Sequence, residues 1–363
     1  ERGWTVDNLW HIFTDFYGGQ YAPLAFLSYL VLYAGFGYDP FYFHMFSLLL
    51  HIGCVCLVWK LISSLLRVHG GVSEKQILYV NFITTLLFAV HPINVEAVAW
   101  ISALKVLLYA FFYLLGLLCY LRYIRTSKIF YYVLTIGCFL CSFWGKEQAV
   151  TFPLALLIVD WFTNRNMKNL EVWSEKMSFL IMAFFFGIIA VLSQGKGPYE
   201  MIFPLYQRLL FGCFALVEYI TKSLLPVNLN FFYPFPIVLG EEPPLHYYLY
   251  PVVLLFLMGW IIAYRNNRYL VFGVLLFLVN LLFSIHLFNM SRHAIVADRY
   301  MYLSYVGIAF LIANGIWWLR KRLSYFKAAL VFLFFYCFFL SVYTFHYTKK
   351  WENTTMVKKY TKG

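Results

Sequence analysis

Charge is what this sequence has least of, and that shortage sets the class of protein. Of its 363 residues only 12% are charged and 63% are hydrophobic, with a mean hydropathy of +0.72. Soluble domains carry about 25% charged residues, so the composition excludes a water-soluble globule. A soluble domain, an internal repeat and a low-complexity linker are also lacking. Because helices satisfy their own backbone hydrogen bonds inside a bilayer, we expect an all-α polytopic membrane protein.

Cysteine patterns typical of metal sites are absent as well. The seven cysteines lie mostly inside apolar segments, and none has zinc-type spacing with a histidine. We therefore interpret them as small buried side chains. The chain also lacks a signal peptide and begins with Glu1 rather than Met, so we expect a further segment upstream.

Membrane topology explains the net charge of +12 better than nucleic acid does. Most lysines and arginines lie in short connections between apolar segments, which the positive-inside rule places in the cytoplasm. Anionic lipid headgroups attract such connections, and we expect the bilayer as a partner and no nucleic acid. The basic connections run over 67–75, 122–128, 165–176, 265–268 and 320–327.

Apolar segments that are long enough, or nearly long enough, to cross a bilayer recur from end to end. We predict about ten spanning helices on this basis. They run over 40–64, 76–90, 104–121, 129–144, 148–163, 177–194, 248–263, 269–287, 301–318 and 328–345.

Residues 206–225 resemble a further span, but the basic connections argue against it. If this segment crossed, the connections at 265–268 and 320–327 would face outward. Its polar residues fall within about 100° on a helical wheel, which predicts an amphipathic helix at the membrane surface or along a cavity. These polar residues are Gln207, Arg208, Glu218 and Lys222.

This topology gathers the longer polar loops on the non-cytoplasmic face. We expect a first external loop with juxtamembrane helices over 1–39 and a transmembrane domain over 40–345. The latter includes an external loop over 195–247, and an external tail follows over 346–363. The stretches 91–104 and 288–300 and the turn at Gly145-Lys146-Glu147 share the same face.

Short motifs along the chain occur in an order that is known from one family. They are Tyr21-Ala22-Pro23-Leu24 with Leu27-Ser28-Tyr29, Phe36 to Pro40, His44 with Leu48 to His51, His91 to Trp100, Gly145-Lys146-Glu147 with Val150 to Pro153, Gln207-Arg208, Leu225-Pro226, Ala297 to Leu303 and Lys350 to Asn353. By these motifs the chain resembles the membrane domain of the protein O-mannosyltransferase-like family. This family comprises the transmembrane and tetratricopeptide-repeat-containing proteins and their bacterial relatives.

The resemblance implies a C-type glycosyltransferase fold that takes a sugar from a polyprenyl phosphate on the non-cytoplasmic face. It also implies a bacterial inner membrane, with the endoplasmic reticulum as the alternative, and a non-cytoplasmic tail that could bind protein partners. The family's catalytic aspartate would lie upstream of Glu1. Relatives often carry Glu-Arg-Lys-Asp where this chain reads Ala103-Leu104-Lys105-Val106. That difference favours a rival function, a catalytically degenerate scaffold or complex subunit, and a transporter ranks third.

Acidic and histidine side chains on the outer face are candidates for the chemistry. Glu96 is the leading carboxylate, either as a catalytic acid that positions acceptor or metal or as a helix-start charge. His91 either contacts the donor or caps a turn before Pro92. A divalent metal is one candidate cofactor. His44 and His51 could bind such a metal, but for these two residues we favour interhelical hydrogen bonds.

Cationic side chains on this face are candidates for binding the donor phosphate. Lys146 lies between two predicted helices of about 16 residues, each about 24 Å long. Because the bilayer core is about 30 Å thick, we expect the turn at Lys146 to lie slightly within the membrane, where the lysine needs an anion. That anion is either the donor phosphate or Glu147. Asp298 is a supporting residue and the alternative partner of Arg299. The predicted phosphate-binding residues are Lys146, Arg299, Arg292, Lys105 and Arg208, the last of which could instead snorkel to the headgroups.

Overall fold

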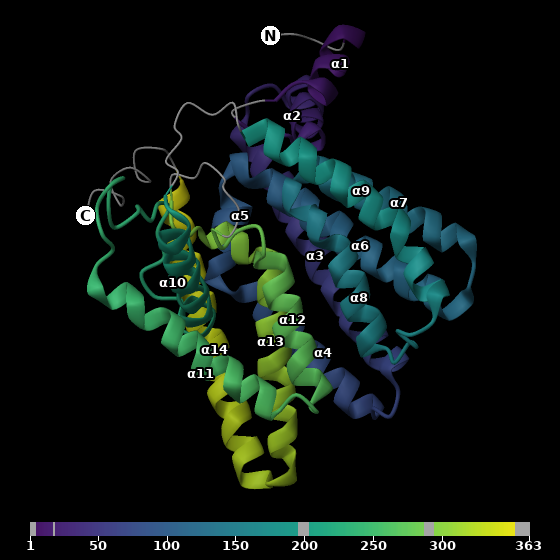
Figure 1. Ribbon diagram of the computed structural model, residues 1–363, viewed down its shortest axis with the longest axis vertical. Coiled ribbons are helices and arrows are strands. Elements are labelled where there is room, and N and C mark those ends of the chain that lie inside the picture. The colour runs from purple at the N-terminus through teal and green to yellow at the C-terminus, as the bar shows by residue number, and fades with distance from the viewer. Residues whose placement is uncertain (1–4, 17–18, 195–202, 287–293, 353–363) are drawn as a thin grey trace. The chain divides into compact units, whose positions relative to one another are not determined.

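The computed structural model describes residues 5–16, 19–194, 203–286 and 294–352, and within them every regular element is a helix. Figure 1 shows the order of these helices along the chain. The predicted all-α membrane architecture is confirmed for this part of the chain. By its internal contacts the chain divides into two compact units, Glu1–Ser73 with Ala97–Gly197 and Glu74–Glu96 with Pro198–Gly363.

The first unit is built around α6, which packs against α3 and α7. A Cβ atom at Gly145 would lie 2.7 Å from the backbone nitrogen of Tyr109, so only glycine allows α6 and α7 to approach this closely. The unit contains α1 (Val6–Thr14), α2 (Pro23–Phe36), α3 (Pro40–His69), α6 (Leu104–Thr126), α7 (Ile129–Gly145), α8 (Phe152–Phe162) and α9 (Leu170–Gln194).

The second unit is built around α13, which packs between α4 and α12. A Cβ atom at Gly307 would lie 2.5 Å from the carbonyl oxygen of Gly273, so the backbones of α12 and α13 are in direct contact. The α-helices of this unit are α4 (Glu74–Val90), α10 (Leu205–Leu224), α11 (Leu249–Ala263), α12 (Arg268–Leu281), α13 (Met301–Trp318) and α14 (Leu323–Thr348). The short helix α5 (Val95–Ala99) crosses the boundary between the units.

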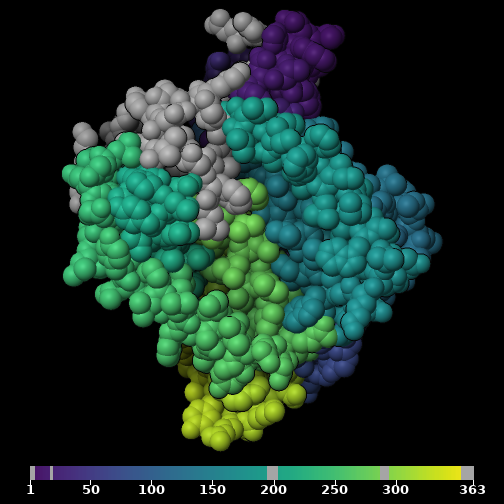
Figure 2. All heavy atoms as spheres, viewed as in Figure 1, coloured from purple at the N-terminus to yellow at the C-terminus, as the bar shows by residue number. Residues whose placement is uncertain are grey.

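Six helices among the described residues are long and apolar enough to cross a bilayer, and a seventh span is formed if the bent pair Glu74–Val90 and Pro92–Ala99 is one span. The six are Pro40–His69, Ile101–Thr126, Leu170–Ser193, Leu245–Ala263, Asp298–Lys321 and Leu323–Trp351. Figure 2 shows α11 on the surface of the second unit, where its apolar side chains are exposed.

The remaining predicted spans are shorter helices. Ile129–Gly145 and Arg268–Leu281 have 17 and 14 residues, and a helix of 17 residues is only about 26 Å long. The segment 148–163 begins as a 3₁₀ turn, η3 (Glu147–Thr151), and continues as the 11-residue α8, which has Pro153 in its first turn. A helix therefore occurs at each predicted position, but the length criterion supports fewer spans than the predicted ten.

The helix α10 forms where the amphipathic helix is predicted and is not among the candidate spans. Its polar face is directed into the unit, because Gln207 and Lys222 are only 2% and 3% exposed. Leu205 and Leu209 are exposed instead. Gln207 and Lys222 both donate to other parts of the chain, so these two side chains are not presented to water.

Candidate functional site

A sharp turn between α4 and α5 brings Glu96 into the second unit. Pro92 starts the 3₁₀ helix η1 (Pro92–Asn94), which follows α4 at an angle of 51°. His91 Nδ1 accepts a hydrogen bond from the Ile93 amide at 3.2 Å, and Asn94 Nδ2 donates to the Phe88 carbonyl at 2.7 Å. The turn is therefore stabilised by its own side chains, and Glu96 lies in the first turn of α5.

Glu96 and Arg299 form a two-point contact across 203 residues of sequence. The Arg299 amide donates to Glu96 Oε2 at 2.7 Å, and its guanidinium donates to Glu96 Oε1 at 2.5 Å. The Glu96 side chain is fully buried and that of Arg299 is 20% exposed. Charge-assisted bonds of this kind fix orientation strongly. Because both Glu96 oxygens accept from Arg299, the carboxylate fixes the position of the Arg299 backbone and guanidinium.

The fully buried Asp298 belongs to a second group of contacts. Lys222 Nζ donates to Asp298 Oδ1 at 3.3 Å, and the Tyr233 hydroxyl donates to Asp298 Oδ2 at 3.0 Å. The Lys222 ammonium lies 3.4 Å from the centroid of the Tyr233 ring. The same ammonium lies 3.6 Å from Glu218 Oε1. Asp298 and Arg299 thus each bond to a partner elsewhere in the chain, Asp298 to Lys222 and Arg299 to Glu96.

Tyr233 is kept as a hydrogen-bond donor by its surroundings. Burial and the nearby charge of Asp298 raise the pKa of the Tyr233 hydroxyl well above its ordinary value. The shift strengthens the preference of the hydroxyl for its protonated form, which donates to the carboxylate. Tyr233 was not singled out in the sequence, because it lies in a loop of mixed composition with no motif that marks it.

His91 is buried beside this group and acts in the turn. Its ring lies 4.2 Å from that of Tyr305 between centroids, and its Nδ1 caps η1. These contacts agree with the interpretation of His91 as a capping residue.

Among the described residues no set of three or more His, Cys, Asp and Glu side chains is arranged to hold a metal ion.

The other predicted cations belong to several elements of the chain. Arg208 is in the first turn of α10, and its buried Nε has no hydrogen-bond partner in the described part of the chain. Lys105 and Lys146 belong to the first unit, where Lys105 donates to Gln20 and Lys146 follows α7 as a residue only 3% exposed. Arg292 lies outside the described residues.

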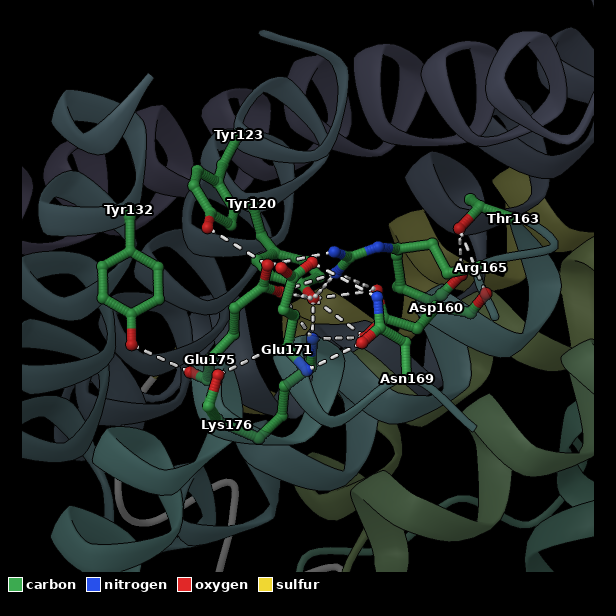
Figure 3. A network of polar contacts seen from close by, with 12 residues as sticks. Tyr120, Tyr123, Tyr132, Asp160, Thr163, Arg165, Asn169, Glu171, Glu175 and Lys176 are labelled. Carbon is green, nitrogen blue, oxygen red and sulfur yellow. Dashed lines mark hydrogen bonds and ion pairs between the residues drawn. The ribbon is translucent and has the colours of Figure 1, made fainter. Parts of the chain in front are cut away.

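A second ionic group, which the sequence analysis missed, lies in the first unit (Figure 3). Asp160 is fully buried and pairs with Lys176, which is also fully buried. Arg165 bonds to Glu175 at 2.6 and 3.0 Å and to Asp160 at 3.3 Å, and Tyr120 donates to Asp160 at 2.8 Å.

The charges of this second group balance, with two carboxylates and two cations. The hydrogen bond from Arg165 to Glu175 contributes most to raising the pKa of that guanidinium. A single acid in the otherwise apolar helix Phe152–Phe162 was the available sequence signal. Because every charge has an opposite partner, the group is suited to holding α6, α8 and α9 together.

Sequence comparison relates the chain to proteins from animals that are named as O-mannosyl-transferases. It is 33% identical over 189 residues to human Protein O-mannosyl-transferase TMTC2, an alignment covering 47% of this chain and 21% of that protein. The corresponding mouse protein is 32% identical over 189 residues, with 47% and 21% covered. Protein O-mannosyl-transferase Tmtc3 of Drosophila melanogaster is 28% identical over 172 residues, with 42% and 18% covered.

The alignments cover about a fifth of the length of each of these relatives. No family model matches the chain, and no solved structure matches it. The resemblance inferred from the short motifs is nevertheless confirmed, because these relatives carry the same family's name.

Proposed function

We propose that this chain is part of a membrane glycosyltransferase of the C-type fold, which transfers a sugar from a polyprenyl-phosphate donor to a hydroxyl acceptor. The names of its relatives and its several apolar helices support this function. The observation that carries it is the pair of Glu96 and Arg299. It joins two of the motifs on which the resemblance rests, His91 to Trp100 and Ala297 to Leu303.

In this proposal the shorter helices also cross or enter the membrane, giving about ten crossings. The site faces the non-cytoplasmic side of a bacterial inner membrane, or of the endoplasmic reticulum, and the tail over 346–363 lies on the same side and binds protein partners. The positive-inside arrangement of the basic connections supports this orientation.

Arg299 is the proposed contact for the leaving phosphate, which gains negative charge as the sugar departs. Glu96 holds the guanidinium through two hydrogen bonds, so Arg299 is oriented before the donor arrives. Arg208, Lys105, Lys146 and Arg292 are further candidates for this phosphate. The catalytic carboxylate that deprotonates the acceptor is expected upstream of Glu1.

A non-catalytic scaffold is the second candidate, and one observation favours it. Where relatives often carry two acids and an arginine, this chain has Ala103, Leu104 and Val106, which are at most 1% exposed. These side chains pack in the apolar interior and could not contact a polar ligand. The scaffold function predicts donor binding that is weak or lost and no sugar transfer.

The test is mannose transfer from a polyprenyl-phosphate donor by the purified full-length protein in detergent or vesicles. Arg299→Ala should lower turnover by about 10²- to 10³-fold, the cost of losing one preorganised charge-stabilising donor. Glu96→Gln should lower it less, because the amide keeps one acceptor for Arg299. Arg322→Ala, at an exposed position, is the control and should match the wild type. Unchanged turnover in both site variants would refute the proposed site, and an inactive wild type would favour the scaffold.

A further inference from the structure

Lys222 and its neighbours fix the backbone that presents Arg299. Two residues on one face of α10, Tyr219 and Lys222, contact consecutive residues in the segment before α13. The Tyr219 hydroxyl accepts from the Ala297 amide at 3.1 Å, and Lys222 donates to Asp298 at 3.3 Å. Residues three apart on a helix lie on the same side. The end of α10 therefore docks on the segment immediately before Arg299.

Tyr233 holds the same segment from the other direction. Its carbonyl oxygen accepts from the Ile295 amide at 2.9 Å, and it forms an isolated antiparallel bridge with Val296. Its hydroxyl accepts from the Asn230 amide at 2.6 Å while it donates to Asp298. The Tyr233 ring also packs against the Lys222 ammonium, which restricts the position of the cation.

The charges explain why these contacts matter for Arg299. Asp298 precedes Arg299 directly and is fully buried, so its carboxylate requires a cation nearby. Lys222 supplies that cation. Its other acidic neighbour, Glu218, is farther from the ammonium at 3.6 Å and has a side chain that is 33% exposed, so Asp298 is the closer and more buried partner. Without Lys222, we expect Arg299, the next residue in the sequence, to be drawn from Glu96 to the Asp298 carboxylate.

We propose that Lys222 and Tyr233 are positioning residues that keep the Asp298 carboxylate away from Arg299, so that Arg299 stays on Glu96 and oriented for the donor phosphate. This inference rests on the proposed function and concerns the same site. Nothing in the sequence motifs marks Lys222 for this role, because it lies in the last turn of an amphipathic helix where a lysine is commonly exposed.

The experiment compares the donor KM and kcat of five full-length proteins: wild type, Lys222→Met, Lys222→Met with Asp298→Asn, Lys222→Arg and the control Lys321→Met. Lys222→Met leaves the Asp298 charge uncompensated and should raise the donor KM by about tenfold, within the range of couplings between contacting charges. Adding Asp298→Asn removes the competing charge and should restore most of the affinity. Lys222→Arg keeps the cation and should stay close to the wild type, as should the control Lys321→Met at an exposed lysine.

A loss of packing alone would not be repaired by Asp298→Asn, so an active protein in which the double variant is no better than Lys222→Met overturns the inference. A second measurement is independent of turnover. Glu96→Gln should lower the melting temperature in the wild-type background and much less in the Lys222→Met background, where the Glu96 and Arg299 pair is already broken. Equal losses in both backgrounds would also overturn it. If the wild type is inactive but Glu96→Gln lowers the melting temperature less in the Lys222→Met background, the proposed function is refuted and the positioning role is retained.

Discussion

Asp160 is the residue on which the ionic group of the first unit depends most, because it is fully buried and bonds to Lys176, Arg165 and Tyr120. Asp160→Asn leaves the buried Lys176 ammonium without its closest charge partner. Removing one member of a buried pair costs about 3–5 kcal/mol, so we expect a marked fall in the melting temperature of the detergent-solubilised protein. Glu171→Gln, at an exposed position in the first turn of α9, should change it little. Equal melting temperatures for the two variants would contradict a structural role for the group.

Residue types alone allowed Glu96 and Arg299 to be predicted as candidates, but not as partners. A buried carboxylate needs compensation, and several cations were available to supply it. Which cation pairs with Glu96 depends on the packing of α4 against α13, which brings together two residues that are 203 positions apart in the sequence. The Lys222 and Tyr233 contacts with Asp298 were missed for the same reason, because the sequence neighbour of Asp298 is the more obvious partner.

Gly145 sets the distance between α6 and α7. Gly145→Ala would place a Cβ atom 2.7 Å from the Tyr109 backbone nitrogen, and this overpacking should destabilise the protein by about 1–3 kcal/mol. The matched control is Gly137→Ala in the same helix, where no atom lies within 4 Å of the added carbon and the higher helix propensity of alanine should be neutral or stabilising. Thermal unfolding of both variants checks this, and an unaffected Gly145→Ala protein would show that α6 and α7 can separate freely.

The amphipathic pattern of α10 predicted its extent and its polar face from the spacing of four side chains. Periodicity, however, does not identify what covers that face. The buried partners of α10 come from distant segments, with Glu241 accepting from Gln207 and Asp298 from Lys222.

The orientation of the whole molecule in the membrane can be tested at the two ends of α11. In a background with its native cysteines replaced, Leu245→Cys and Arg265→Cys introduce thiols at exposed positions. If α11 crosses the bilayer and basic connections face the cytoplasm, an impermeant thiol reagent should label position 245 from the non-cytoplasmic side and position 265 only after permeabilisation. Labelling of both positions from one side would contradict the predicted topology.

Composition was sufficient to predict a helical membrane protein, and apolar run lengths placed the helices closely. Run length was a poorer guide to how many helices cross, because polar breaks such as Lys146 and His91 divide apolar sequence into short or bent pieces. The energy of such a break depends on the protein around it, which run length does not describe.

Glu96 is the last residue of the stretch Glu74–Glu96 of the second unit. Glu96 and Ala97 are consecutive residues assigned to different compact units, so the peptide bond after Glu96 is one of the few covalent links between them. The Glu96 carboxylate is clamped on Arg299 only a few bonds from that link. The two bonds to Arg299 therefore anchor the chain within the second unit at the last residue before it leaves that unit.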